Sequence, residues 1–251
     1  MNITKKERAL LFACVLVLVL FFGGLLLLLR QQGETKTSTT PNRRTFGALR
    51  PVVSPTVVAI FSDNFFDNSQ NWDVGNEAKY GSTINNGTLT MMEANHKPFR
   101  EPLPSNVAYG DVAVSTTVTL LEGDQNDSVG LYFRANGSTG QGYYIDIYGD
   151  DTYDIAKITI DANQKISATY LAEPQHSSAL HPKGQKNNVM VVMKGENIVL
   201  LMNNTVVKSV RDGEFPSGKI MLFVENGNSS NGVTASFDAI AVYTAPDRLP
   251  S

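Results

Sequence analysis

The sequence predicts an all-β domain, built as a two-sheet antiparallel sandwich and preceded by one transmembrane helix. Residues 9–29 are 21 consecutive residues without a charged or hydrogen-bonding side chain. From residue 57 onward, short runs alternate apolar and polar residues and are separated by Gly, Asn and Asp, and we find no 3.6-residue apolar period there. The single cysteine, Cys14, excludes both a disulfide framework and a four-thiolate zinc site.

The N-terminal segment predicts a membrane anchor. A helix of residues 9–29 would be about 31 Å long, which matches a hydrocarbon core of about 30 Å. A cleaved signal peptide is the alternative, but its apolar region would be about 7–15 residues long and would end in a small-residue cleavage site. The segment instead ends LLLLLRQQG. Residues 1–8 carry basic residues directly before the apolar run, which favours a cytoplasmic N-terminal tail.

The next segment, residues 30–56, predicts an extended stalk. It is rich in Ser, Thr, Pro and Arg, and Pro41, Pro51 and Pro55 oppose a helix. With the N-terminus inside, the remaining domain lies outside the cell. A disulfide-free exposed domain is more typical of a bacterial surface protein than of a secreted animal protein.

Residues 57–245 predict one domain of about a dozen strands, followed by a short C-terminal tail at 246–251. Asp111–Leu121 places Val112, Val114, Val118 and Leu120 on one face. Similar runs occur at 87–92, 128–134, 142–148, 153–160, 164–171, 188–194, 197–202, 205–210, 218–225 and 233–243. Turn sequences such as Asn86-Gly87 and Asn203-Asn204 separate them. This number of strands suits a sandwich of the jelly-roll type.

Several motifs follow one another in an order that marks a known family. They are FSDNFFDNSQNWDV at 61–74, GLYFR at 130–134, Tyr143-Tyr144, NIVLLMN at 197–203, FPSGKI at 215–220 and FDAIAV at 237–242. Together they resemble bacterial concanavalin A-like, laminin G-like jelly rolls, and in particular the 3-keto-disaccharide hydrolase domains related in fold to glycoside hydrolase family sixteen. The resemblance implies two antiparallel sheets whose first and last strands are neighbours. It also implies either carbohydrate binding or glycoside hydrolysis.

One strand pair carries the candidate ligand-binding residues. If 130–134 and 143–148 form a hairpin, alternation places one set of side chains on the face opposite the core: Tyr132, Arg134, Tyr144, Asp146 and Tyr148. We expect Tyr153 and Lys157 beside them. Aromatic rings next to charged hydrogen-bonding groups suit the apolar faces and hydroxyl rims of sugars. The alternative is a solvated outer face on which these residues only stabilise the sheet.

Catalysis has weaker support in the sequence. Glycosidases use two carboxyl groups, and the only one that we place on this face is Asp146. The string Glu122–Asp127 lacks the last Glu of the E-x-D-x-x-E pattern of family-sixteen glucanases, and its Gly and Asn predict a turn. We therefore favour non-catalytic carbohydrate binding over hydrolysis of 3-keto or related disaccharides. A protein-interaction module without a sugar ligand is the third hypothesis.

The remaining expectations concern metal and nucleic acid. We expect no cofactor, although Asp63 and Asp238, on the first and last strands, are candidate ligands of a structural calcium ion, as are the acidic turns at 124–127 and 150–154. Residues 1–60 hold eight Lys+Arg and two Asp+Glu, and residues 61–251 hold 13 and 22, which gives charges of +6 and −9. An acidic domain argues against nucleic-acid binding.

Overall fold

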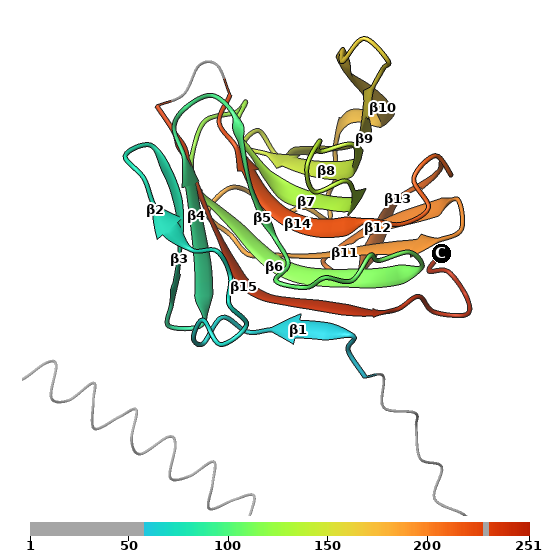
Figure 1. The fold of residues 1–251 in the computed structure, drawn as a ribbon, viewed down its shortest axis with the longest axis horizontal. Coiled ribbons are helices and arrows are strands. Elements are labelled where there is room, and N and C mark those ends of the chain that lie inside the picture. The colour runs from blue at the N-terminus through green and yellow to red at the C-terminus, as the bar shows by residue number, and fades with distance from the viewer. Residues whose placement is uncertain (1–57, 228–230) are drawn as a thin grey trace, which may run out of the picture. The chain divides into compact units, whose positions relative to one another are not determined.

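The computed structural model describes residues 58–227 and 231–251. In this part of the chain every strand pairing is antiparallel, and the strands form two sheets (Figure 1). The prediction of an all-β, two-sheet antiparallel sandwich is confirmed. Over residues 58–227 and 231–251 there is no helix long and apolar enough to cross a membrane. The predicted span at 9–29 and the predicted stalk lie outside the described residues.

The larger sheet has nine strands in the order β13-β12-β11-β6-β15-β4-β3-β2, with β1 paired to β15. Their bounds are β1 Phe61–Asp63, β2 Gly75–Asn76, β3 Tyr80–Asn85, β4 Thr88–Glu93, β6 Val112–Glu122, β11 Asn187–Lys194, β12 Asn197–Met202, β13 Thr205–Arg211 and β15 Val233–Thr244. The first and last strands are neighbours, as expected, because Phe61–Asp63 pairs with Ile240–Val242.

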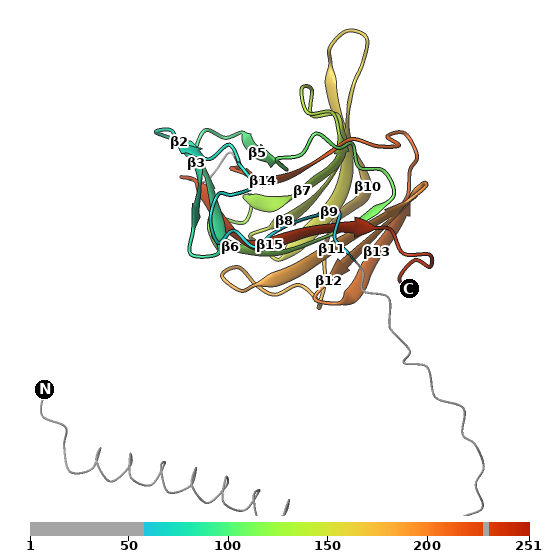
Figure 2. The ribbon, with the colours of Figure 1, turned by 60° about the horizontal axis from the view of Figure 1, so that its bottom comes forward.

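The smaller sheet has six strands in the order β10-β9-β8-β7-β14-β5. Their bounds are β5 Pro98–Pro102, β7 Ser128–Ala135, β8 Gly142–Tyr148, β9 Thr152–Ile160, β10 Ile166–His176 and β14 Lys219–Glu225. The expected hairpin of residues 128–148 is present as β7 and β8. Figure 2 shows the β9–β10 hairpin projecting from the rest of the sandwich.

The core lies between the two sheets and follows strand alternation. Leu131 and Phe133 of β7, together with Ile145 and Ile147 of β8, are buried in it as expected. We call the opposite side of the six-stranded sheet its outer face. Because alternate residues point to opposite sides, the hairpin that supplies the core also sends Ser128, Gly130, Tyr132, Tyr144, Asp146 and Tyr148 to the outer face.

The N-terminal end of the domain is fixed by Trp72. Its ring is 3% exposed and packs against Phe61 and Phe65, with ring centroids 6.3 and 5.3 Å away. The indole Nε1–H donates a hydrogen bond to Asp63 Oδ2 at 2.7 Å. Trp72 therefore belongs to the core.

Candidate functional site

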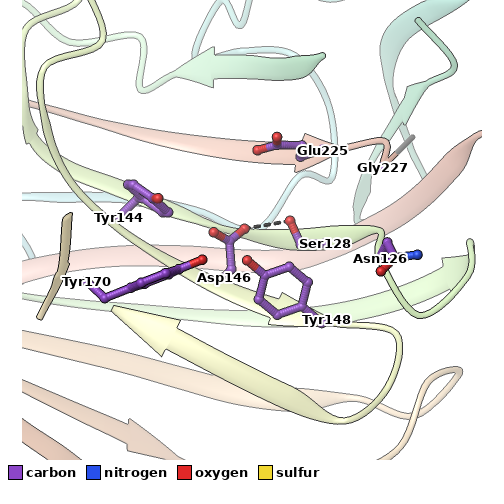
Figure 3. A pocket seen from close by; sticks show the side chains of 8 residues that line it. All are labelled: Asn126, Ser128, Tyr144, Asp146, Tyr148, Tyr170, Glu225 and Gly227. Atoms are coloured by element: carbon purple, nitrogen blue, oxygen red, sulfur yellow. Dashed lines mark hydrogen bonds between the residues drawn. The ribbon is translucent and has the colours of Figure 1, made fainter. Parts of the chain in front are cut away.

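A pocket of about 540 Å³ lies on the outer face of the six-stranded sheet (Figure 3). It is lined by Asn126, Ser128, Tyr144, Asp146, Tyr148, Tyr170, Glu225 and Gly227. The residues come from β7, β8, β10 and β14 and from the loops that precede β7 and follow β14. Three of the five predicted ligand-binding residues, Tyr144, Asp146 and Tyr148, are therefore brought together in one pocket. Ligand binding by them remains a prediction.

The hollow exists because the strand in its middle carries small side chains. β7 lies between β8 and β14, and its outer-face residues at this point are only Ser128 and Gly130. At the same level β8 carries Asp146 and β14 carries Glu225. A Cβ atom on Gly130 would lie 1.9 Å from the carbonyl oxygen of Ile145 and 2.8 Å from the Phe223 ring. Only glycine fits at position 130. The space above it separates the carboxyl groups of Asp146 and Glu225, which Figure 3 shows on different strands.

Asp146 lines the pocket beside a second aspartate that lies behind the lining. Its side chain is 3% exposed and accepts a hydrogen bond from Ser128 Oγ at 2.5 Å. Asp154 of β9 pairs directly opposite Asp146 and is fully buried. Burial raises the pKa of both carboxyls, and for Asp146 the neighbouring charge of Asp154 raises it further. At least one proton is therefore held on this pair under conditions in which isolated aspartates are ionised.

Asp154 has only part of its hydrogen-bonding capacity used by the protein. Its Oδ2 accepts a hydrogen bond from the Tyr148 hydroxyl at 2.9 Å, whereas its buried Oδ1 has no hydrogen-bond partner. A buried acceptor without a donor costs free energy that the fold does not recover. Asp154 lies behind the pocket lining, and Tyr148 connects it to the pocket.

Glu225 supplies the carboxyl group on the other side. It ends β14, pairs with Ser128 and lines the pocket. Burial raises its pKa, and the nearby Arg100 guanidinium acts in the opposite direction. The sequence placed a single carboxylate on this face, and the structure corrects that number: Glu225 and Asp154 join Asp146.

Tyrosine rings form the other wall. Tyr144 stacks on Tyr132 with ring centroids 5.3 Å apart, and Tyr170 of β10 lines the pocket with 47% of its surface exposed. Burial raises the pKa of the Tyr144 and Tyr148 hydroxyls, and the charge of Asp146 raises it further. These phenols therefore remain protonated and can donate hydrogen bonds.

Tyr132 shares the outer face as predicted but does not line the pocket. Only 2% of it is exposed, because Arg100 of β5 covers its ring with the guanidinium carbon 4.6 Å from the ring centroid. Arg100 Nη2 also donates a hydrogen bond to the Tyr132 hydroxyl at 3.0 Å. Tyr132 thus supports the ring of Tyr144 from below. Arg100 lies close enough to Glu225 for its positive charge to lower the pKa of that carboxyl group.

Arg134 does not share this face, so that prediction is wrong. Its backbone has a positive φ of 49°, and the pairing of β7 with β14 shifts register between Lys219 and Met221. The resulting bulge turns the side chain away from the tyrosines. Arg134 is 2% exposed, and its guanidinium donates hydrogen bonds to the carbonyls of Gly110, Gly195 and Phe215 and to the Asp111 carboxylate.

Tyr153 and Lys157 also lie away from the pocket. Tyr153 is buried in the core and donates its hydroxyl hydrogen bond to the carbonyl of Val207 at 3.0 Å. Lys157 forms ion pairs with Asp212 and Glu214 at 2.6 and 2.7 Å. The expectation failed because Asp154, and not Tyr153, is the residue of β9 that pairs opposite Asp146.

The candidate calcium ligands have protein partners. Asp63 accepts hydrogen bonds from the Trp72 indole and from the backbone of Phe65, and Asp238 forms an ion pair with Lys186. Over residues 58–227 and 231–251, no group of three or more His, Cys, Asp or Glu side chains is arranged to hold a metal ion. Calcium binding remains an expectation drawn from the sequence.

Three solved structures that share the fold are a carbohydrate-binding module and two enzymes named for their carbohydrate substrates. The carbohydrate-binding module CBM66 from Bacillus subtilis has a TM-score of 0.52 at 16% identity, and the match covers 68% of this chain and 94% of that one. The κ-carrageenase from Pseudoalteromonas carrageenovora, in complex with an oligotetrasaccharide of κ-carrageenan, scores 0.53 at 12% identity and covers 79% and 99%. An endo-β-galactosidase from Clostridium perfringens that releases GlcNAcα1-4Gal scores 0.55 at 12% identity and covers 81% and 66%.

These similarities concern the fold, since every identity is low. A search of the curated proteins gave no match. The sequence itself matches a family model described as the 3-keto-α-glucoside-1,2-lyase-like domain, over residues 61–242. That range includes every strand that contributes to the pocket. The matched family corresponds to the one predicted from the motifs. The chain therefore belongs to the 3-keto-α-glucoside-1,2-lyase-like domain family.

Proposed function

We propose that this domain binds a saccharide in the pocket on the outer face of the six-stranded sheet. The observation that carries the proposal is the lining itself, in which the rings of Tyr144, Tyr148 and Tyr170 stand beside the carboxyl groups of Asp146 and Glu225. Aromatic faces pack against the C–H surfaces of a pyranose ring, while carboxyl and phenol groups bind its hydroxyls. The carbohydrate-binding and carbohydrate-hydrolysing proteins that share the fold support this proposal.

A glycan array probed with the full-length chain tests it. We expect binding to at least one saccharide class and loss of that binding in Tyr144→Ala. Tyr80→Ala is the matched control, because Tyr80 is 41% exposed and lies outside the pocket. Thermal melting of both variants separates unfolding from loss of contact. If no saccharide binds, or if Tyr80→Ala and Tyr144→Ala lose binding equally, the proposal fails.

A second candidate function, acid–base catalysis on a 3-keto glycoside, is favoured by the two carboxyl groups on different sides of the pocket. In such a substrate the C3 ketone acidifies the proton on C2. An ionised Glu225 would take that proton, the C1–O bond would break as the C1=C2 bond forms, and a protonated Asp146 would give its proton to the departing oxygen. The products would be an unsaturated 3-keto sugar and an alcohol. The raised pKa of Asp146 suits the acid role.

Turnover of a 3-keto-α-glucoside, followed by release of the alcohol, tests this second function. We expect Asp146→Asn and Glu225→Gln each to reduce kcat at least 100-fold, since each removes one proton-transfer step. The exposed Glu77→Gln is the control and should retain full activity. Saccharide binding without any turnover by the wild-type chain would leave the first function and refute the second.

We also propose that residues 9–29 anchor the domain in the cell membrane with the domain outside, on the strength of the 21-residue apolar run. Protease added to intact cells should then remove the domain while residues 1–8 stay protected. A domain that resists protease until the cells are lysed would contradict this topology.

A further inference from the structure

The β9–β10 hairpin extends well beyond the sheet to which it belongs (Figures 1 and 2). β9 runs to Ile160, the turn occupies residues 161–165, and β10 begins at Ile166. All residues from 161 to 170 are exposed. Most of this extension therefore makes no contribution to the core, and its sequence is not constrained by core packing.

The two faces of the extension differ in polarity. Pairing of Ile166 with Ile160, of Ala168 with Ile158 and of Tyr170 with Ala156 places six apolar or aromatic side chains on one face. The other face carries Lys157, Thr159, Ser167 and Thr169. Along the apolar face, 66% of the surface of Ile166 and 47% of that of Tyr170 are exposed. We call this face the apolar strip.

The apolar strip is continuous with the pocket. Tyr170 lines the pocket, and Ile158 packs against the outer-face cluster that contains Tyr132 and Phe223. From Tyr170 the strip continues for four residues to Ile166, or about 13 Å at 3.3 Å per residue, and two strands are about 10 Å wide. No charged side chain lies on the strip between these two residues.

We propose that the apolar strip binds the aglycone of a glycoside whose sugar occupies the pocket, and that this aglycone is a flat, apolar ring system. The inference rests on the proposed saccharide binding. A patch of about 10 by 13 Å matches two fused aromatic rings. It is far smaller than the roughly 800 Å² that each partner contributes to a stable protein interface, which argues against a second copy of the chain as its occupant.

Titration calorimetry with two 3-keto-α-glucosides, one methyl and one 2-naphthyl, tests the proposal on the full-length chain in a sugar-free detergent. We expect the naphthyl glycoside to bind about tenfold more tightly, since burial of its rings adds apolar contact. Ile166→Asn should reduce this ratio to less than threefold and leave the methyl glycoside unaffected. Ser167→Asn, on the polar face of the same strand, should retain the full ratio.

The outcomes separate the two proposals. Equal affinity for the methyl and naphthyl glycosides overturns the aglycone site and leaves saccharide binding intact. Failure of both probes to bind overturns the aglycone site, whereas the proposed saccharide binding fails only if the glycan array also shows no binding. Sedimentation provides the remaining outcome: a concentration-dependent dimer that Ile166→Asn abolishes would show that a second copy covers the strip, and would overturn the proposal.

Discussion

The two ends of the β7–β8 hairpin both bury charge, but they do so in opposite ways. At the bulge, Arg134 is surrounded by acceptors from three separate segments, and each nitrogen of its guanidinium donates at least one hydrogen bond. At the pocket, Asp146 and Asp154 face each other as two buried carboxyl groups, and one buried oxygen of Asp154 has no partner. The first arrangement stabilises the fold, whereas the second costs free energy. A buried charged residue therefore does not by itself mark a functional site. The two ends of the hairpin differ in whether the buried groups have hydrogen-bond partners.

The largest effect is expected at the bulge. Arg134→Met removes the donor shared by the carbonyls of Gly110, Gly195 and Phe215 and should lower the free energy of unfolding by about 3 kcal/mol. Arg211→Met is the control, because Arg211 forms an exposed ion pair with Glu196 and should cost less than about 1 kcal/mol. Urea denaturation measures both. If the two variants lose the same stability, the contrast drawn for Arg134 is wrong.

Glu101 tests whether a buried carboxyl group can have a raised pKa without lining a pocket. It is 3% exposed on β5 and accepts a hydrogen bond from Ser82 Oγ at 2.5 Å, and burial raises its pKa to about 7. Because the folded state holds this proton more tightly than the unfolded chain does, the group destabilises the fold as pH rises from about 4.5 through 7.

Glu101→Gln should therefore stabilise the protein at pH 8, on the order of 2 kcal/mol, and have little effect at pH 4. Thermal or urea unfolding at the two pH values measures this difference. The exposed Glu77→Gln should show no such dependence on pH. A stability gain in Glu101→Gln that is the same at both pH values would contradict the buried titration.

Asp146→Asn sharpens the comparison at the pocket. The amide oxygen can still accept the Ser128 hydrogen bond, and repulsion with Asp154 disappears, so stability at pH 8 should rise by about 1 kcal/mol. The same variant should lose turnover of a 3-keto glycoside. A variant that is less stable than the wild type at pH 8 would show that Asp146 stabilises the fold, and would remove the contrast with Arg134.

The smallest effect on the stability of the fold is expected at the edge of the pocket. Tyr170 is half exposed and contributes one ring face, so Tyr170→Ala should weaken saccharide binding about tenfold, or about 1.4 kcal/mol, with little change in the free energy of unfolding. Calorimetry gives the affinity. Tyr80→Ala provides the matched loss of an exposed ring outside the pocket, and an equal loss of affinity in both variants would exclude a specific contact.

Strand alternation predicted the hairpin that carries the site and three of the eight residues that line the pocket. The hairpin of residues 128–148 and its core face were predictable because the sequence alternates cleanly on both strands. Arg134 was misplaced because a bulge reverses side-chain direction and an arginine at positive φ leaves no local signal. Glu225 was missed because its neighbour, β7, lies about a hundred residues earlier in the chain, and strand order is a property of the whole sheet.

Asp154 was missed for a more local reason. The turn between β8 and β9 contains Asp151 at a φ of 64°, and the pairing that follows places Tyr153 in the core and Asp154 opposite Asp146. A change of one residue in a register exchanges the two faces of a strand. The acidic turn composition indicated where the chain reverses but did not fix the number of residues in the turn.

The pairing of β1 with β15 has a mechanical consequence. A pull transmitted from residues before Val58 reaches the domain first at Phe61–Asp63, a strand of three residues paired with the last strand. The Trp72 indole, bonded to Asp63, fastens this strand to the core. Load on a tether would therefore reach this short strand pair first, whereas the pocket strands β7, β8 and β14 belong to the other sheet.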